Sequence, residues 1–294
     1  MESPSTPAAP RTVILYHGNC PDGFGGAYAA WKKFGDSAEY IPLSRDAAPP
    51  TPESLSGAAL YFVDFCFPKD QMDGYVATAG SLTVLDHHEG VENVITSMPE
   101  YRYTSEHSGA VISWQYFHPE TPTPLLLQYI EQGDLYKFEM PESEEILSYV
   151  YTRPQAFLEW DMLAAQLADP IERARIIEKG ASYAEHKQII VEQIMHLAEL
   201  VEFEGHRAYL ASCSKQFTSP VGNLLAKRLP PFAMVASVHS WGLRVSLRSA
   251  GEVDVSALAR RYGGNGHPYA AAFSLRWSDP IPWTPILDTK SEAA

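Results

Sequence analysis

Short apolar runs that alternate with helical patterns place the strongest constraint on the fold of this chain. In the first half, strand-like runs cover residues 13–16, 60–63 and 82–85, and helix-like stretches cover 25–34 and 68–79. Strands that are separated by helices pair in parallel, because a helical crossover returns the chain to the same edge of the sheet. We therefore expect an α/β fold with a doubly wound parallel sheet, followed by helices over 108–117 and 124–132.

The second half of the chain changes its pattern twice. Residues 157–200 read as helical, with breaks expected at Pro170 and Gly180, and strand-like runs alternate with helical segments again after Gly205. A length of 294 residues is typical of about two domains. We predict a disordered tail over 1–10, a larger domain over 11–180, a helical connector over 181–204 and a smaller α/β domain over 205–294. The Pro-rich stretch after Trp277 is expected to cover the surface or to be disordered.

Chemically active side chains follow each of the three predicted strands. The carboxyl ends of parallel strands lie along one edge of an open sheet, where ligands bind. Carboxylates crowded there repel one another unless cations neutralise them, and mixed Asp and His ligands suit divalent ions. The residues concerned are His17, Asp22, Asp64, Asp86, His87 and His88, with Asp134 at the end of a predicted helix as a further candidate.

The stretch HGNCPDGFGG at 17–26 admits three interpretations. A phosphate-binding glycine loop is disfavoured because the Walker spacing with its Gly-Lys-Ser/Thr is absent, so the glycines are expected to permit a tight turn into the next helix. A nucleophilic Cys20 has a neighbouring histidine but no evident third orienting group. A metal site that uses His17, Asp22 and Cys20 is the remaining interpretation.

Composition limits the class of protein and its partners. The net charge is −14, which gives no long-range attraction to a long nucleic acid. Three cysteines are too few for a disulfide framework, and the start of the chain lacks a signal-peptide core. We expect a cytoplasmic protein without a membrane segment, and the sequence allows a homodimer.

Four motifs in order resemble the DHH phosphoesterase superfamily and its associated C-terminal domain. They are HGNCPDG at 17–23, FVDF at 62–65, LDHH at 85–88 and GGNGHPYAAAF at 263–273. The resemblance covers roughly residues 12–276. It implies a metal-dependent phosphoesterase that acts on short oligonucleotides or small nucleotides, with two divalent ions for which manganese is favoured over magnesium, iron or zinc.

The resemblance also implies roles for individual residues. His88 would face the scissile phosphate as the catalytic imidazole, with Asp86 as its supporting carboxylate. The proposed metal ligands are His17, Asp22, Asp64, His87 and Asp134, with Asp64 bridging the two ions and Cys20 as an added candidate. The proposed substrate-binding residues are His107, Ser108, Arg248, Gly264, Gly266 and His267, where the glycine N–H groups at 263–266 are expected to converge on an anion.

Two departures from the family pattern leave alternatives open. Cys20 stands where the first motif usually carries an aspartate, and the AAG ending of the last motif reads AAF. An inorganic polyphosphate or pyrophosphate hydrolase and a nucleotide-binding regulator with a weakened metal site are therefore the alternative functions.

Overall fold

The computed structural model describes residues 11–43 and 48–286, so the predicted tail over 1–10 lies outside the described residues. The chain divides into two compact units, Met1–Ala184 and Glu185–Ala294. None of the described helices combines the length and the apolar character needed to cross a bilayer.

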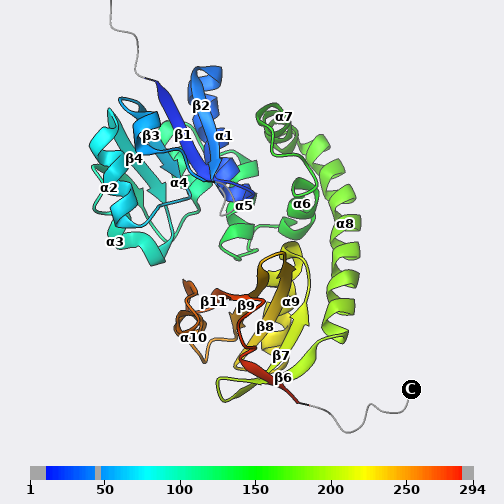
Figure 1. Ribbon diagram of the computed structural model, residues 1–294. Coiled ribbons are helices and arrows are strands. Elements are labelled where there is room, and N and C mark those ends of the chain that lie inside the picture. Colours follow the sequence, from blue (N-terminus) through cyan, green and yellow to red (C-terminus); the bar gives the residue numbers. More distant parts are fainter. Residues whose placement is uncertain (1–10, 44–47, 287–294) are drawn as a thin grey trace, which may run out of the picture. The chain divides into compact units, whose positions relative to one another are not determined.

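A five-stranded sheet forms the centre of the first unit (Figure 1). Its order is β2-β1-β3-β4-β5 and every neighbouring pair is parallel, which confirms the predicted sheet. The two outer strands were not predicted, because edge strands are less apolar and give a weaker pattern. The strands are β1 (Thr12–His17), β2 (Ala38–Leu43), β3 (Ala59–Val63), β4 (Ser81–Asp86) and β5 (Glu100–Tyr103).

Helices cover both faces of this sheet (Figure 1). Successive side chains of a strand point to opposite faces, so Ile14 packs in one core and Val13 in the other. The first face is covered by α1 (Pro21–Phe34) and α4 (Gly109–Phe117), and the same core continues through α5 (Leu125–Asp134), α6 (Ser143–Val150) and α7 (Phe157–Ala168), which pack mainly on these helices and on one another. The second is covered by α2 (Lys69–Thr78) and α3 (Glu92–Ile95), and short 3₁₀ helices occupy Gly35–Ser37, Pro52–Leu55 and Glu89–Val91.

The glycines after Cys20 lie inside α1 and do not form the predicted turn. The helix begins at Pro21, four residues before the predicted start. A Cβ on Gly23 would collide with the carbonyl oxygen of His17, and a Cβ on Gly26 would collide with Val63 on β3. These glycines let the helix approach the sheet closely, so their role is packing.

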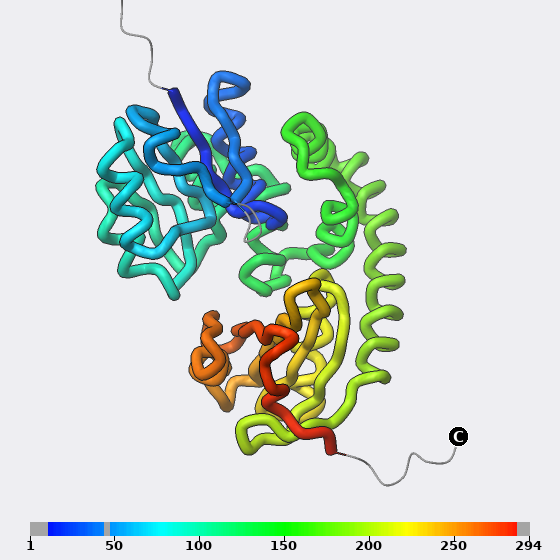
Figure 2. The backbone as a smooth tube through the Cα atoms, viewed as in Figure 1, coloured from blue at the N-terminus to red at the C-terminus, as the bar shows by residue number. Residues whose placement is uncertain are grey.

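A single long helix, α8 (Pro170–His196), runs through the predicted break at Gly180, and this prediction is wrong (Figure 2). The break at Pro170 is confirmed, since α7 ends before it and α8 begins there. A Cβ on Gly180 would collide with the backbone carbonyl of Glu145, so this glycine permits close packing of α8 on α6. The division between the two units falls within α8.

The second unit is built on a mixed sheet of order β10-β11-β9-β8-β7-β6-β12. Helix α9 packs on one face through Val221 and Leu225, and α10 packs on the other through Leu258, which confirms the smaller α/β domain. Within the Pro-rich stretch after Trp277, Trp283–Pro285 form a short edge strand against β6, so this part covers the edge of the sheet and is not disordered. The elements are β6 (Glu199–Phe203), β7 (His206–Ser212), α9 (Lys215–Arg228), β8 (Phe232–His239), β9 (Gly242–Ser249), α10 (Val255–Arg261), β10 (Asn265–His267), β11 (Ala270–Arg276) and β12 (Trp283–Pro285).

Candidate metal centre

Strand register brings the predicted residues of the first unit to one level of the sheet edge. Tyr16 on β1 pairs with Val63 on β3, and Val63 pairs with Leu85 on β4. The next residue on each strand is therefore His17, Asp64 or Asp86. Parallel pairing thus places side chains that lie up to 69 positions apart in one row, as expected from the sequence.

Asp64 lies at the centre of this row and is fully buried. His17 Nδ1 donates to Asp64 Oδ2 at 3.1 Å, and His87 Nε2 lies 3.2 Å from Asp64 Oδ1. Burial by itself raises the pKa of Asp64, but the neighbouring imidazoles of His17 and His87 outweigh burial, and the pKa lies below its ordinary value. Each carboxylate oxygen therefore faces a different imidazole.

The backbone of Asp64 has φ of 54°, in the left-handed region that few residues other than glycine adopt. Aspartate tolerates this conformation better than most residues. Asp64 N donates to Leu85 O at 2.9 Å, so the strained residue is held by β4. Backbone strain of this kind is concentrated at functional sites.

His87 lies among three carboxylates. Its Nε2 is 3.4 Å from Asp134 Oδ2 and 3.8 Å from Asp22 Oδ2, besides its contact with Asp64. Burial opposes the imidazolium, but these carboxylates outweigh it and raise the pKa of His87 to about 10. Burial first, and repulsion by Asp64 next, raise the pKa of Asp134 to about 6. Without a metal ion, protons on His87 and Asp134 thus reduce the negative charge of the cluster. A divalent cation could neutralise the same carboxylates.

Asp22 connects this cluster to the first turn of α4. Its two oxygens accept from Gly109 N at 2.7 Å and Ala110 N at 3.0 Å. A Cβ on Gly109 would lie 2.6 Å from Asp64 Cβ and 2.9 Å from Asp22 Oδ2. Burial, followed by repulsion from Asp134 and Asp64, raises the pKa of Asp22 well above its ordinary value. Only glycine at position 109 leaves room for both carboxylates.

Asp86 organises the turn that follows β4. Its Oδ1 accepts from His87 N at 2.7 Å, from His88 N at 3.2 Å and from His88 Nδ1 at 2.7 Å. Burial opposes the charged form of His88, and the bond to Asp86 outweighs it, so the pKa of His88 is raised. The His88 side chain is 38% exposed, whereas that of His87 is 12% exposed. His88 is therefore the imidazole at the rim of the cluster, and Asp86 orients it.

Cys20 lies within the same cluster. Ligand atoms of His17, Cys20 and Asp64 all lie within 4.8 Å of one another. Burial, followed by the charges of Asp64, Asp22 and Asp134, raises the pKa of Cys20 well above its ordinary value. The geometry groups the Cys20 sulfur with two other candidate metal ligands, and both a ligand role and a nucleophilic role would need the thiolate form.

His107 and Ser108 are positioned by a residue that sequence analysis missed. Glu131 Oε2 accepts from His107 Nδ1 at 3.0 Å and from Ser108 N at 2.9 Å. Glu131 precedes Asp134 by three residues on α5, which places both on one side of the helix. That spacing is the signal that could have indicated Glu131.

Tyr151 is a second residue that the sequence did not indicate. Its hydroxyl lies over Gly133, beside Asp134, where a Cβ would collide with it. Burial, followed by the charges of Asp134, Cys20 and Asp22, raises the pKa of the Tyr151 hydroxyl. This tyrosine follows α6 in a segment without a motif, and only the fold brings it beside the cluster.

The glycine motif of the second unit ends α10. Gly263 N donates to Arg260 O and Gly264 N to Ala259 O, which is a Schellman cap with Gly263 at φ of 71°. Gly266 N donates to Asn265 Oδ1 at 2.8 Å. Each of these three N–H groups thus has an acceptor within the fold, and their convergence on an anion stays a prediction.

Strand register nevertheless groups other predicted residues of this unit. Arg248 on β9 and His267 on β10 both pair with Ala270 of β11, so the three lie in one row on one face of the sheet. Arg248 also donates to Ser219 Oγ at 2.9 Å. The row carries two basic or hydrogen-bonding side chains separated by an alanine.

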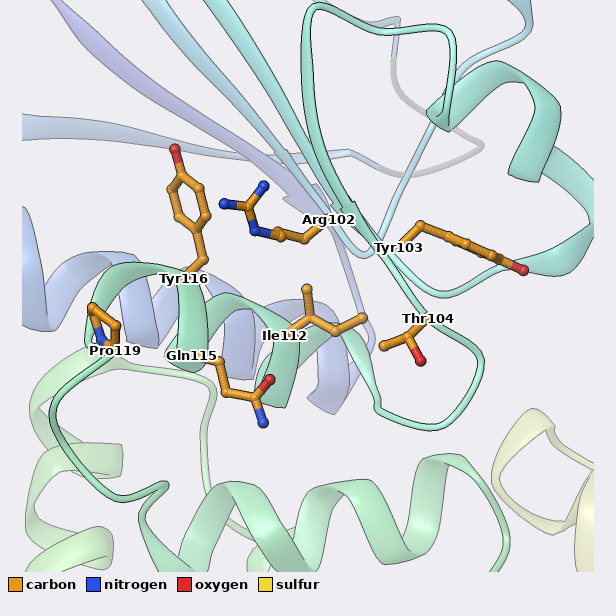
Figure 3. A pocket seen from close by; sticks show the side chains of 7 residues that line it. All are labelled: Arg102, Tyr103, Thr104, Ile112, Gln115, Tyr116 and Pro119. Atoms are coloured by element: carbon orange, nitrogen blue, oxygen red, sulfur yellow. The ribbon is translucent and has the colours of Figure 1, made fainter.

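A pocket of about 420 Å³ lies apart from the predicted ligands, between β5 with its following loop and α4 (Figure 3). Arg102 lies beside the ring of Tyr116, with its guanidinium carbon 5.5 Å from the ring centroid. Tyr103 is in register with Asp86 on β4. The pocket is lined by Arg102, Tyr103, Thr104, Ile112, Gln115, Tyr116 and Pro119, none of which the sequence indicated.

Comparison with curated proteins finds distant relatives, and no family model matches the chain. An uncharacterized protein of Acanthamoeba polyphaga mimivirus is 28% identical, and the match covers 90% of this chain and 67% of the viral protein. Oligoribonuclease NrnB of Bacillus subtilis is 24% identical, and the match covers 76% of this chain and 61% of NrnB.

Solved structures share the fold at low identity. The DHH domain of a protein described as a member of a family of ribosomal proteins superposes with a TM-score of 0.59 at 11% identity, covering 90% of this chain and 82% of that one. An exopolyphosphatase-related protein of Bacteroides fragilis superposes with a TM-score of 0.53 at 14% identity. The match covers 94% of this chain and 89% of that protein.

Proposed function

We propose, from the premise that this chain has the fold of the DHH phosphoesterase superfamily, that the protein is a metal-dependent hydrolase of short oligonucleotides or small nucleotides. The observation that carries the proposal is the cluster at the carboxyl edge of the sheet. There, the ends of β1, β3 and β4 and of α5 bring imidazoles and carboxylates within ion-pair distance of one another.

The residues present fit divalent ions. Asp64 Oδ1 is buried and makes no hydrogen bond among the described residues, although His87 Nε2 lies 3.2 Å away. A buried carboxylate oxygen without a donor is costly unless a cation satisfies it. We assign five residues as the ligands that would hold the ions, with manganese as the favoured ion. These ligands are His17, Asp22, Asp64, His87 and Asp134.

When bound, the two ions supply a Lewis acid and an activated water. The chain itself supplies orientation and a proton. Asp86 holds His88 through Nδ1 at the rim of the cluster. In hydrolysis the water oxygen bonds to phosphorus and the ester oxygen leaves, and we assign the protonation of that oxygen to His88. Asp86 is a positioning residue, because it acts through His88.

Three observations support a short nucleotide substrate. A net charge of −14 disfavours a long polyanion. One relative, NrnB, is named an oligoribonuclease. In the second unit, the row that contains Arg248 and His267 offers hydrogen-bonding groups, and we propose that this row binds the nucleotide. Substrate roles for His107, Ser108, Gly264 and Gly266, a cytoplasmic location and a homodimer stay predictions from the sequence.

A substrate panel tests the proposal. The protein is incubated with Mn²⁺ and, separately, with dinucleotides, cyclic dinucleotides, 3′-phosphoadenosine 5′-phosphate and polyphosphate, and the products are identified. Turnover of a nucleotide that Asp64→Asn abolishes supports the proposal; asparagine retains tolerance of the left-handed backbone while it removes the charge. Hydrolysis of polyphosphate alone, or tight nucleotide binding without Mn²⁺-dependent turnover, would overturn it in favour of the corresponding alternative.

A further inference from the structure

Among the described residues the cluster contains three groups of candidate ligand atoms, one of them Asp64, Asp86, His87 and His88, and the other two differ in chemistry. One group consists of His17, Cys20 and Asp64, and it includes a sulfur atom. Another consists of Asp22, His87 and Asp134, and it offers only oxygen and nitrogen. The two groups are joined through Asp64, whose Oδ2 faces His17 and whose Oδ1 faces His87. The two halves of the site are therefore not equivalent.

Local structure leaves the thiol of Cys20 available to this group. Cys20 is the N-cap residue of α1, a position where serine, threonine, aspartate or asparagine usually caps the helix. The Cys20 side chain makes no capping hydrogen bond, and Pro21 at the first helical position needs no acceptor for its nitrogen. The position therefore holds a thiol beside His17 and Asp64.

A second, independent observation indicates a ligand here. Asp64 is 1% exposed, and its Oδ1 is buried without a hydrogen bond among the described residues. This oxygen belongs to the carboxylate that the sulfur-containing group shares with the rest of the cluster. A cation beside it would satisfy the orphaned oxygen, and the Cys20 sulfur lies within 4.8 Å of an oxygen of the same carboxylate.

We propose that Cys20 is a metal ligand and that it makes the two ion positions selective for different metals. Thiolate sulfur favours zinc, cobalt or iron(II) and contributes little to magnesium binding. The position with Cys20 should thus take such a thiophilic ion, and the position with Asp22, His87 and Asp134 should accept manganese or magnesium. On binding, the metal replaces the thiol proton, which passes to solvent. The inference deepens the proposed function and rests on it for the presence of two ions.

Cobalt spectroscopy tests the ligand directly. Metal-free protein is titrated with Co²⁺, and absorption is recorded in the near ultraviolet, where thiolate-to-cobalt charge transfer appears. We expect the band in the wild type, its loss in Cys20→Ser and its retention in the matched controls Cys66→Ser and Cys213→Ser. Cys66 lies two residues after Asp64 but, like Cys213, belongs to none of the ligand groups found among the described residues. Absence of the band from the wild type, or its persistence in Cys20→Ser, overturns the inference.

Metal competition tests the selectivity. The extent of Cys20 alkylation is measured by mass spectrometry. Bound zinc should protect Cys20 from the alkylating reagent, whereas excess Mg²⁺ should not protect it. Loss of an outer-shell partner lowers metal affinity by about 10- to 100-fold, so Cys20→Ser should weaken one of two zinc sites at least about tenfold. Equal shielding of Cys20 by both ions, or an unchanged zinc site, overturns the selectivity. Cys20→Asp, which keeps a ligand but lacks sulfur, should bind two ions without the cobalt band, and it replaces the serine variant if that fails to fold.

The assignment of Cys20 as a metal ligand and the proposed hydrolase function would be overturned by different results. A cobalt band that depends on Cys20, together with no hydrolysis in the substrate panel, supports the ligand and overturns the proposed function. Mn²⁺-dependent nucleotide hydrolysis without the band overturns the ligand and leaves the proposed function in place.

Discussion

Replacing Gly109 by alanine tests whether the close approach of α4 to the carboxylates is needed for catalysis. The new Cβ would lie 2.6 Å from Asp64 Cβ, whereas an ordinary contact begins at 3.4 Å. The atoms must therefore separate by 3.4 − 2.6 = 0.8 Å. The same Cβ would lie 3.1 Å from Asp64 Cα, so the displacement falls on the residue with the left-handed backbone.

The expected effect on stability is small and the effect on turnover is large. Overpacking costs about 1–3 kcal/mol, and alanine in place of a helical glycine returns roughly 0.5–1 kcal/mol. The free energy of unfolding should thus fall by roughly 0–2.5 kcal/mol. A misplacement of about 1 Å can lower turnover about 100-fold, so we expect kcat to fall about 10- to 100-fold.

The assay is Mn²⁺-supported hydrolysis of the best nucleotide substrate, with urea unfolding measured in parallel. Gly74→Ala is the matched control, because Gly74 also lies in a helix and its Cβ would meet only the ring of Pro52, at 3.2 Å. This control should unfold at the same or a slightly higher urea concentration and keep normal kcat. A folded Gly109→Ala protein with kcat within about twofold of the wild type would refute the packing argument.

Three further changes test other parts of the site. Asp134 has a pKa of about 6 in the metal-free fold and about 3.9 when unfolded, so its charge lowers stability as the pH rises from about 4 to 6. In chelator, Asp134→Asn should therefore be more stable than the wild type at pH 7 by on the order of 1–2 kcal/mol, and equal stability in urea titrations would contradict this. Tyr151→Phe should lower kcat several-fold, whereas Tyr149→Phe should not, and identical kcat values would remove Tyr151 from the site. His267→Ala should raise KM about 10- to 100-fold without changing metal content, and an unchanged KM would count against the row of the second unit as a nucleotide site.

The candidate ligands could be predicted because their positions depend on local pattern and on a general rule of topology. Residues 13–16, 60–63 and 82–85 are apolar enough to identify as central strands, and parallel strands end at one edge. The position of His17, Asp64 and Asp86 at or directly after the end of a predicted strand was therefore enough to predict that they lie close together. The outer strands β2 and β5 could not be identified in this way, because half-exposed edge strands lack the continuous apolar run.

Glycines were the least predictable feature, since a glycine serves conformation in one place and packing in another. The local sequence pattern indicates turns or breaks at Gly23, Gly26 and Gly180. In the structure these glycines lie inside helices and permit close contacts with neighbouring backbone and side-chain atoms. Gly263 reads as part of an anion loop but caps α10 at positive φ. Which role applies depends on atoms that are distant in sequence.

The sequence alone determined the alternation of strands and helices, the doubly wound sheet and the acidic and imidazole residues at its edge, because these follow from periodicities of two and 3.6 and from residue types. Only the tertiary structure decided which oxygen of Asp64 faces which imidazole, that its backbone is left-handed and that Glu131 and Tyr151 lie beside the ligands. The physical reason is that orientation and electrostatic coupling depend on distances of a few ångströms between segments that are far apart in the chain, and no local pattern encodes those distances.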